Sequence, residues 1–406
     1  MWLVPREDLT PTQVQAIELN TRQNHVVTGG PGSGKTVVLA YRAASLIERG
    51  THDSKLKIIV FTKTLRDYIK PEVQRFLDVP ESCFRTFDQF CRDIYERRVS
   101  RRVPWDEENK RPDFEGIRSG VLNLLRDGHE AREFDAILVD EGQDLNADAL
   151  ELLRLVSKHV TVMMDEKQQI YDTGSAIGEA LIALGLTSVS VNLTDTYRCC
   201  PYISALAGHF ILDPVQRAFF MKQTRAEQTE KETPLLYLAP DFDEEKRRLA
   251  DLINERLQRN DRIAILLPFN RQVHGFQAGL AEYGVDAEVP PKRANAAHTT
   301  AEYDWSSGRP KLMTYHSAKG LTFDSVFVPR LTPRSFARTA ENILFRQLFI
   351  AIARATRWVY LSTDGGEALP IFSAFRAAER EGILKIQSHV IGPKPTRPRK
   401  KDDFAF

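Results

Sequence analysis

The sequence predicts an α/β protein with two lobes, each built around a parallel β-sheet. Short runs rich in Val, Ile and Leu alternate with longer segments that carry apolar residues at helical spacing. Continuous apolar runs of this kind suit strands that are buried on both faces of a parallel sheet. Strands that alternate with helices indicate a doubly wound fold. The pattern occurs once before and once after about residue 196, and it therefore predicts two lobes.

The apolar runs identify the strands, and the segments between them identify helices. The predicted strands, in chain order, are 25–30, 56–62, 134–140, 159–165, 263–268, 311–316, 324–329 and 358–363. Apolar residues at helical spacing predict helices over 36–49, 147–159 and 245–258. Ligands of open α/β sheets bind at the carboxyl ends of the strands, so we expect functional side chains directly after these runs.

The composition is that of a globular protein and excludes several classes. The chain has 406 residues, of which 42% are hydrophobic and 27% charged, and this excludes a wholly disordered or collagen-like protein. A net charge of +1 means that any affinity for nucleic acid must come from local patches. The cysteines lack the spacing of a zinc site or a disulfide framework. No apolar run approaches the roughly 18–20 residues of a membrane span. We expect a cytoplasmic protein without membrane contact.

A glycine-rich segment directly follows the first predicted strand and reads G-x-x-x-x-G-K-T. Its glycines let consecutive backbone N–H groups turn inward around phosphates, and the following helix contributes its positive end. Lys35 would neutralise phosphate oxygens, and the Thr36 hydroxyl would bind Mg²⁺. The expected phosphate-binding residues are Gly29, Gly30, Pro31, Gly32, Ser33, Gly34, Lys35 and Thr36.

Two adjacent carboxylates end another predicted strand. Asp140 and Glu141 follow the apolar residues 136–139, at the sheet edge where ligands bind. Asp140 would hold Mg²⁺ through water, and Glu141 would polarise an attacking water, which a hydrolase requires. Two exposed acids in a loop are the alternative interpretation, and the phosphate-binding segment upstream argues against it.

Seven motifs along the chain resemble, in order, those of superfamily 1 helicases of the UvrD/Rep/PcrA type. They are LTPTQVQA at 9–16, GGPGSGKT at 29–36, DEGQD at 140–144, DEKQQIY at 165–171, LTDTYR at 193–198, TYHSAKGLTFD at 314–324 and RQLFIAIARA at 346–355. The resemblance runs from about Leu9 to Leu361, and seven ordered motifs are far more specific than one. It implies two RecA-like lobes, with an ATP site in the cleft between them.

The resemblance assigns roles to individual residues. Gln13 would read the adenine edge, and Tyr197 would stack on the adenine ring. Gln168 would sense the γ-phosphate, which Arg198 would also contact. Arg354, from the second lobe, would act as an arginine finger. ATP and Mg²⁺ are the expected cofactors. The expected catalytic residues are Lys35, Glu141, Gln168, Arg198 and Arg354. The expected nucleotide-binding residues outside the glycine-rich segment are Gln13, Tyr197 and Gly320.

The motif order also predicts the domain organisation. We expect one lobe over 1–196, a second over 197–391, and a disordered, basic tail over 392–406. Larger members of the family carry sizeable insertions in both lobes, whereas this chain has room for only a small insertion at about 92–130. A motor core of this kind is expected to translocate yet to separate strands poorly.

The expected contacts to nucleic acid depart from the family pattern. By resemblance they are Thr62, Lys63, Thr86, Tyr171 and His316. Lys63 stands where the family usually has an aromatic residue, and 172–175 lack the family's tryptophan. Stacking on a base is worth roughly 1–3 kcal/mol, so a weaker grip on single strands is expected. The arginine-rich segment 92–102 either lines a single-strand groove or forms a solvated helix face.

The resemblance implies an ATP-hydrolysing translocase or helicase on single-stranded DNA, with 3′→5′ polarity, in DNA repair or anti-phage defence. One alternative is an ATPase subunit that depends on a partner such as a nuclease. Another is a nucleotide-switched clamp without autonomous unwinding. RNA is an alternative track, because no residue that reads the 2′-hydroxyl is recognisable in the sequence.

Overall fold

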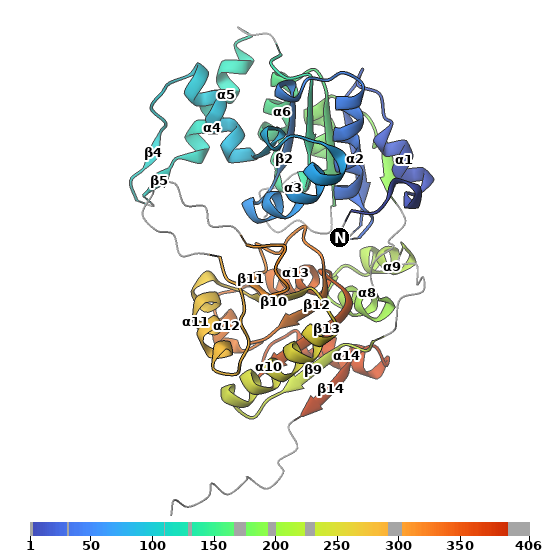
Figure 1. Cartoon of the computed structure of the whole chain (residues 1–406), viewed down its shortest axis with the longest axis vertical. Helices are drawn as coiled ribbons and strands as arrows, with labels where there is room; N and C mark the ends of the chain where they lie inside the picture. Colours follow the sequence, from blue (N-terminus) through green and yellow to red (C-terminus); the bar gives the residue numbers. More distant parts are fainter. Residues whose placement is uncertain are drawn as a thin grey trace, which may run out of the picture.

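The structure is a computed structural model, and it describes residues 3–30, 32–108, 110–128, 132–165, 176–193, 200–223, 232–290 and 303–388. The chain forms two lobes stacked along the long axis of the molecule (Figure 1). Each lobe contains a six-stranded parallel sheet with helices on both faces. The α/β fold with two RecA-like lobes that the sequence predicts is therefore confirmed.

The first sheet is built from strands that all precede residue 194. Their order in the sheet is β3 (Phe84–Thr86), β2 (Leu56–Val60), β6 (Ala136–Val139), β7 (Val160–Met164), β1 (His25–Gly29) and β8 (Val191–Leu193). Consecutive residues of these strands face opposite sides, so that Ile58 and Ile59 belong to two different apolar clusters. One face is covered by α1 (Pro11–Ile17), α2 (Lys35–Glu48) and α3 (Lys63–Leu77). The other is covered by α4 (Phe87–Arg98), α5 (Phe114–Arg126), α6 (Ala147–Val156) and α7 (Ile177–Leu184).

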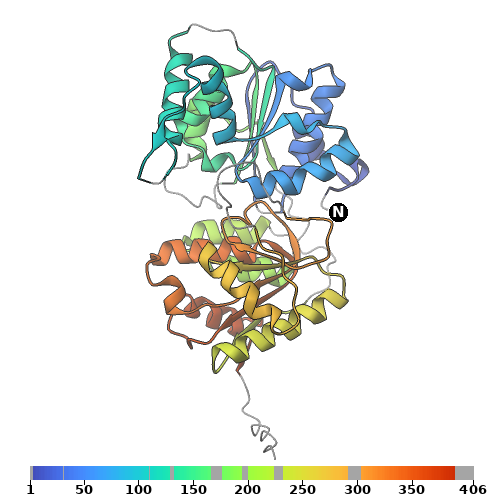
Figure 2. The ribbon, with the colours of Figure 1, turned by 60° about the vertical axis from the view of Figure 1, so that its left-hand side comes forward.

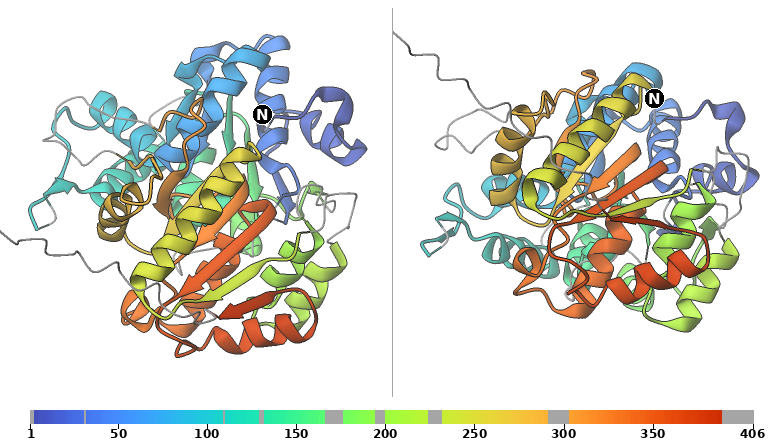
Figure 3. Two further views of the ribbon diagram at one scale, coloured as in Figure 1. Left: turned by 60° about the horizontal axis from the view of Figure 1, so that its bottom comes forward. Right: turned by 90° about the horizontal axis from the view of Figure 1, so that it is seen from below.

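The second sheet is built from strands that all follow residue 234. Their order in the sheet is β11 (Lys311–Thr314), β10 (Ile263–Leu267), β12 (Phe323–Val328), β13 (Ala355–Thr363), β9 (Leu235–Leu238) and β14 (Lys385–Ser388). One face carries α10 (Phe242–Gln258) and α11 (Asn270–Ala281) (Figure 3). The opposite face carries α8 (Pro201–Gly208), α9 (Pro214–Gln223), α13 (Glu341–Ile352) and α14 (Phe372–Arg380), while the short α12 spans Pro333–Phe336.

Side-chain caps determine where the helices of the first lobe begin. At the start of α4, the Thr86 hydroxyl accepts a hydrogen bond from Gln89 N, and the Gln89 side chain accepts one from Thr86 N. Asp113 of α5 and Asn146 of α6 each accept one such backbone hydrogen bond, from Gly116 N and Ala149 N, without the reciprocal bond. Such caps pair N–H groups that a helix leaves without a partner in its first turn. They bring the amino-terminal turns of three helices to defined places beside the sheet.

All eight runs that the sequence predicts as buried strands are strands. The strands that the sequence does not predict are β3, β8 and β14 at the sheet edges, the antiparallel pair β4 (Trp105–Asp106) and β5 (Arg111–Pro112), and β9, an interior strand of four residues. The helix predicted over 147–159 ends at Val156, because the chain there turns into β7. The predicted lobe boundary at 196 and the predicted tail over 392–406 lie outside the described residues.

The two lobes are in direct contact. The apolar cluster that packs under α2 and α3 continues into the second lobe, where it includes Tyr315 and Leu321. Tyr68 of α3 packs against Trp305, with 4.9 Å between the ring centroids. Phe61, which follows β2, packs against His316 at 5.5 Å. The carboxyl end of the first sheet therefore faces the second lobe. No described helix has the length and apolar character to span a membrane.

Candidate functional site

The glycine-rich segment links β1 to α2 in the conformation that its sequence requires. Gly34 forms the N-cap of α2 with φ +85°, in the left-handed region that only glycine adopts without strain. A Cβ at this position would collide with Nε2 of Gln13. The tight turn lets α2 begin at Lys35, so that its amino-terminal end is directed at the loop, where backbone N–H groups bind anions.

The Lys35 ammonium group lies across the mouth of this loop. Its Nζ donates to the carbonyl oxygens of Gly29 at 2.7 Å and Gly30 at 2.9 Å. It also forms an ion pair with Asp165 Oδ2 at 3.2 Å, and both side chains are buried. Asp165 follows β7 and is held in turn because its backbone N–H donates to Gln143 Oε1 at 2.8 Å. A buried, oriented cation at this place suits the oxygens of a phosphate chain.

The hydroxyl and carboxylate predicted to bind Mg²⁺ are adjacent. Thr36 Oγ1 donates to Asp140 Oδ2 at 2.8 Å. Burial, and then the neighbouring charge of Glu141, raise the pKa of Asp140. Among the described residues, no three His, Cys, Asp or Glu side chains are grouped as a metal site. Mg²⁺ commonly takes one or two protein oxygens and completes its shell with phosphate and water. Thr36 and Asp140 fit this pattern.

A buried hydroxyl in the loop supports the same interpretation. Ser33 is 1% exposed, and its Oγ has no hydrogen-bond partner within the described chain. Buried polar atoms in native proteins are nearly always paired, so an orphaned hydroxyl here indicates a ligand that supplies the acceptor. The residues present therefore fit a nucleoside triphosphate with its magnesium ion.

Glu141 is held in a strained and highly charged environment. Its φ of +55° lies in the left-handed region, which is uncommon for a residue with a Cβ and concentrates at functional sites. Burial opposes ionisation of its carboxyl group. The positive charges of Lys319, Lys35 and Arg354 outweigh this effect and hold the pKa of Glu141 below its usual range. Gln143 Nε2 donates to Oε2 of Glu141 and orients the group. An ionised, oriented carboxylate is what a general base requires.

The second lobe reaches this carboxylate through Lys319. Its side chain is 1% exposed, and its ammonium group pairs with Asp144 Oδ2 at 2.5 Å, while Oε2 of Glu141 lies 3.6 Å away. Gly320 follows with φ +79°. A Cβ there would lie 2.8 and 2.9 Å from the two δ-carbons of Leu65 and 3.4 Å from Oε1 of Glu141. Because Gly320 has no side chain, the backbone of the second lobe can approach Leu65 and Glu141 of the first lobe this closely.

Arg354 also comes from the second lobe. It lies between α13 and β13 and is 5% exposed, and its guanidinium group donates to the carbonyls of Ile350 at 3.1 Å and Leu321 at 3.3 Å. Its charge acts on Glu141. The structure therefore brings Lys35, Thr36, Asp140, Glu141, Gly320 and Arg354 together where the two lobes meet.

Gln13 contacts the phosphate loop. Its Nε2 donates to the Ser33 carbonyl at 3.0 Å, and its Oε1 accepts from Thr10 N at 3.0 Å. Both polar atoms of the Gln13 side-chain amide are thus hydrogen-bonded within the protein. These contacts connect α1 to the phosphate loop. The adenine-reading role that the resemblance implies stays a prediction.

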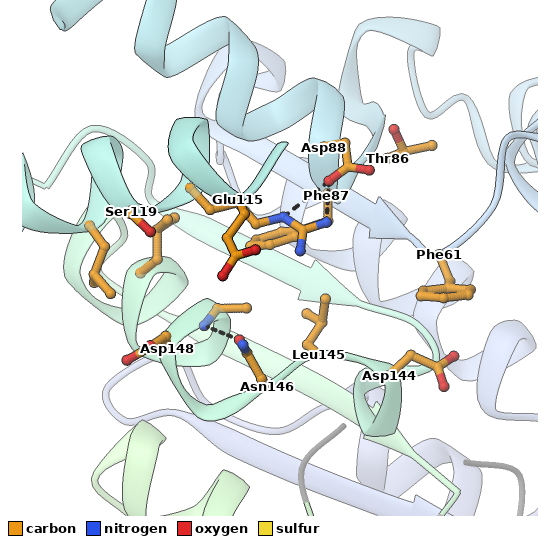
Figure 4. Close-up of a pocket in the computed structure, with 14 residues that line it drawn as sticks. Phe61, Thr86, Phe87, Asp88, Glu115, Ser119, Asp144, Leu145, Asn146 and Asp148 are labelled. Atoms are coloured by element: carbon orange, nitrogen blue, oxygen red, sulfur yellow. Dashed lines mark hydrogen bonds and ion pairs between the residues drawn. The ribbon is translucent and has the colours of Figure 1, made fainter. Parts of the chain in front are cut away.

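The described nucleic-acid candidates lie at the carboxyl ends of strands, with Thr62, Lys63 and Thr86 in the first lobe and His316 in the second. Thr62 and Thr86 each accept a hydrogen bond at a helix start, and Lys63 is the exposed first residue of α3. His316 packs on Phe61, and burial, followed by the nearby charge of Lys319, lowers the pKa of His316. Thr86 and Phe61 line the same cavity (Figure 4). The remaining predicted residues, Pro31, Gln168, Tyr171, Tyr197 and Arg198, lie outside the described part of the chain.

The arginine-rich segment pairs locally with acids. Arg97 and Arg98 both pair with Glu133, at 2.6 and 2.8 Å, and Arg92 pairs with Glu96 at 2.6 Å. Of the two interpretations that the sequence left open, these contacts favour the solvated helix face.

Sequence reasoning assigned no role to four residues of the site. They are Gln143, Asp144, Asp165 and Lys319. The signal for Asp165 was present, because it ends β7 in the same way as Asp140 ends β6. The pairing of Lys319 with Asp144 had no local signal, since it joins motifs from different lobes.

A family model and a curated relative agree with the motifs. Residues 9–130 and 105–177 match the family model described as the UvrD/REP helicase N-terminal domain. A protein named "Probable DNA helicase" from Mycoplasma pneumoniae is 25% identical over 294 residues, which is 66% of this chain and 51% of that protein. The chain thus spans about half the length of this relative. The C-terminal domain of a possible DNA helicase from Lactobacillus plantarum WCFS1 is 16% identical, with a TM-score of 0.35 over 47% of this chain and 98% of that structure.

Proposed function

The chain belongs to the UvrD-like superfamily 1 helicases, and from this premise we propose that it hydrolyses ATP to move along single-stranded DNA. The observation that supports the proposal best is the contact of Lys319, Gly320 and Arg354 of the second lobe with Glu141 and Asp144 of the first. Residues of both lobes complete one site, so events at that site change how the lobes contact each other.

The chemistry that we propose divides the work among the residues of the cleft. Lys35 binds phosphate oxygens, and Glu141 accepts a proton from the attacking water. Arg354 stabilises charge on the transferred phosphoryl group, an effect worth 10³–10⁵ in rate for arginine fingers generally. Thr36 and Asp140 would hold Mg²⁺, which would neutralise charge on the phosphates.

Movement would follow from the ion pairs that cross the cleft. The pairs of Lys319 with Asp144 and Glu141 depend on the charge of the site. Binding and hydrolysis of ATP change that charge and bias the lobes between two relative positions. A strand bound across both lobes, through Thr62, Thr86 and His316, would be displaced by this cycle.

We propose lobe boundaries at 1–196 and 197–391, an insertion at about 92–130, and 3′→5′ movement, as the resemblance implies. The same proposal places the protein in the cytoplasm and assigns it to DNA repair or phage defence. It includes a partner such as a nuclease. RNA is the alternative track.

The test is steady-state ATPase of the purified chain with and without single-stranded DNA. Glu141→Gln serves as the blank. Glu48→Gln removes one exposed charge at the far end of α2, about 20 Å along the helix from the loop, and serves as the control. Strong stimulation by DNA, absent in Glu141→Gln and kept in Glu48→Gln, is the expected result. A flat, low rate would contradict a DNA motor and favour the partner-dependent ATPase or the nucleotide-switched clamp.

A further inference from the structure

Arg42 is a buried cation that the proposed chemistry does not use. It lies on α2, seven residues after Lys35, and it is 1% exposed. Seven residues make about two turns, so the two cations face the same side of α2, about 10 Å apart along its axis. Burial, and then the nearby charge of Arg49, lower the pKa of Arg42 to about 10, so Arg42 is still charged at neutral pH. No carboxylate of the described residues is among its hydrogen-bond partners.

Four hydrogen bonds hold the Arg42 guanidinium group between α1 and the first sheet. Nη1 donates to the carbonyl oxygens of Ile17 at 2.9 Å and Leu19 at 2.7 Å, at the carboxyl end of α1. Nε donates to Oγ1 of Thr161 in β7 at 2.9 Å, and Nη2 lies 2.9 Å from Nε2 of His159. The unpaired carbonyls at the carboxyl end of a helix attract a cation. Arg42 therefore joins α1 to α2 and to β7.

His159 accepts its hydrogen bond from Arg42 as a neutral ring. Burial, and then the charge of Arg42, lower the pKa of His159 to about 3. Its Nδ1 lies 2.7 Å from the carbonyl oxygen of Gln23, so Nδ1 has the proton and Nε2 the lone pair. The guanidinium group thus bonds uncharged acceptors. Burying a charge in this way costs free energy. Among side chains, only arginine offers a planar group with N–H donors on several sides, which can bond α1 and β7 at once.

The opposite end of α1 contacts the phosphate loop. Gln13 Nε2 donates to the Ser33 carbonyl, and a Cβ at Gly34 would collide with the same nitrogen. α1 has seven residues and lies beside α2 (Figure 1 and Figure 2). So short a helix has little stability of its own, and its position therefore depends on contacts of this kind. The contact of Gln13 with the loop should thus depend on the hydrogen bonds that Arg42 makes at the other end.

We propose that Arg42 is a positioning residue for nucleotide binding: it holds α1 against α2 and β7, and it thereby keeps Gln13 on the phosphate loop. The assignment rests on the nucleotide site of the proposed function and adds to it a residue outside the motif boxes. Loss of these hydrogen bonds should weaken ATP binding. It should leave the rate of hydrolysis of bound ATP unchanged, because none of the four involves Glu141 or Arg354.

The test measures equilibrium binding of a fluorescent ATP analogue and steady-state ATPase on the full chain. Arg42→Gln, whose shorter amide cannot bond α1 and β7 together, should weaken binding at least about fivefold, on the order of one lost hydrogen bond. Its kcat at saturating ATP should stay that of the parent. Arg42→Lys, whose ammonium group can still bond a carbonyl of α1, should lose less affinity. Arg49→Lys changes an exposed arginine at the end of α2 and should alter neither quantity. The midpoint of a binding titration is unaffected by a fraction of unfolded protein.

A double variant shows whether Arg42 acts through Gln13. Substitutions within one set of contacts are not additive, whereas those at independent sites add. Gln13→Ala combined with Arg42→Gln should therefore bind ATP as Gln13→Ala alone does. Losses that multiply in the double variant, a loss confined to kcat, or unchanged binding in Arg42→Gln would overturn the assignment.

Failure of the proposed function gives a different result. A parent chain that binds ATP without DNA-stimulated hydrolysis would refute the DNA motor, and the binding constants of the variants would still decide the role of Arg42. A parent chain that binds no ATP would overturn both proposals.

Discussion

Lys319 of the second lobe lies 2.5 Å from Asp144 of the first, and both side chains are buried. Their ion pair joins two motifs that are 175 positions apart in the sequence. The same ammonium group lies near Glu141, so one side chain connects the lobe interface to the expected general base.

Removing this ammonium group should destabilise the protein and leave Asp144 charged and buried. Lys319→Met keeps most of the side-chain volume but not the charge, and breaking a buried pair in this way costs about 3–5 kcal/mol. The urea midpoint, followed by tryptophan fluorescence, measures the loss. The double variant Lys319→Met, Asp144→Asn removes both charges and should recover most of the stability. A single variant as stable as the parent would contradict the pairing.

Two substitutions in the nucleotide site should separate binding from hydrolysis. Lys35→Ala removes the buried cation and should abolish both ATP binding and hydrolysis. Glu141→Gln removes only the proton acceptor, so it should abolish hydrolysis but keep ATP binding. Equilibrium binding of a fluorescent ATP analogue, together with steady-state ATPase, distinguishes the two. Equal loss of binding in both variants would refute the roles assigned to them.

Arg354→Ala should leave ATP binding mostly intact and slow turnover by ~10³ or more, because the arginine stabilises charge that develops only during phosphoryl transfer. Single-turnover hydrolysis with saturating enzyme measures the chemical step. Arg357→Ala, which removes a half-exposed arginine close by in the sequence, is the control. Near-normal turnover in Arg354→Ala would mean that the second lobe does not complete the site.

Gly320→Ala should lower both stability and ATPase, and Gly284→Ala is its matched control. Both glycines have φ +79°, so a left-handed alanine costs about 1–2 kcal/mol at either position. A Cβ at 284 meets nothing within 4 Å, whereas one at 320 meets Leu65 and Glu141. Only Gly320→Ala should therefore disturb the contact between the lobes. The thermal midpoint and the ATPase rate are measured for both variants, and the difference between them reports the contact without the shared backbone strain. Equal losses of stability and ATPase in the two variants would show that the contact at Gly320 is unimportant.

The sequence predicts most interior strands of both sheets, because strands buried on both faces require continuous apolar residues. It misses β9, an interior strand whose apolar run is only Leu-Leu-Tyr-Leu. It does not predict β14, whose Lys-Ile-Gln-Ser pattern reflects an edge strand with exposed side chains. In the site, the roles of Lys35, Thr36 and Asp140 depend on local motifs. The left-handed backbone of Glu141 and the reach of Lys319 depend on packing between distant segments, which no local pattern encodes.

The apolar cluster shared by the two lobes limits how they can move. Leu65 and Val73 of α3 belong to the same cluster as Tyr315 and Ala318 of the second lobe. Pulling the lobes straight apart would expose this surface to water at about 25 cal/mol for each Å². A sliding movement keeps this apolar surface covered. We therefore expect the lobes to move by shear, parallel to their contact, and not by hinge opening. By the same reasoning, either lobe produced alone would expose the apolar surface that the other lobe covers, and it would tend to aggregate.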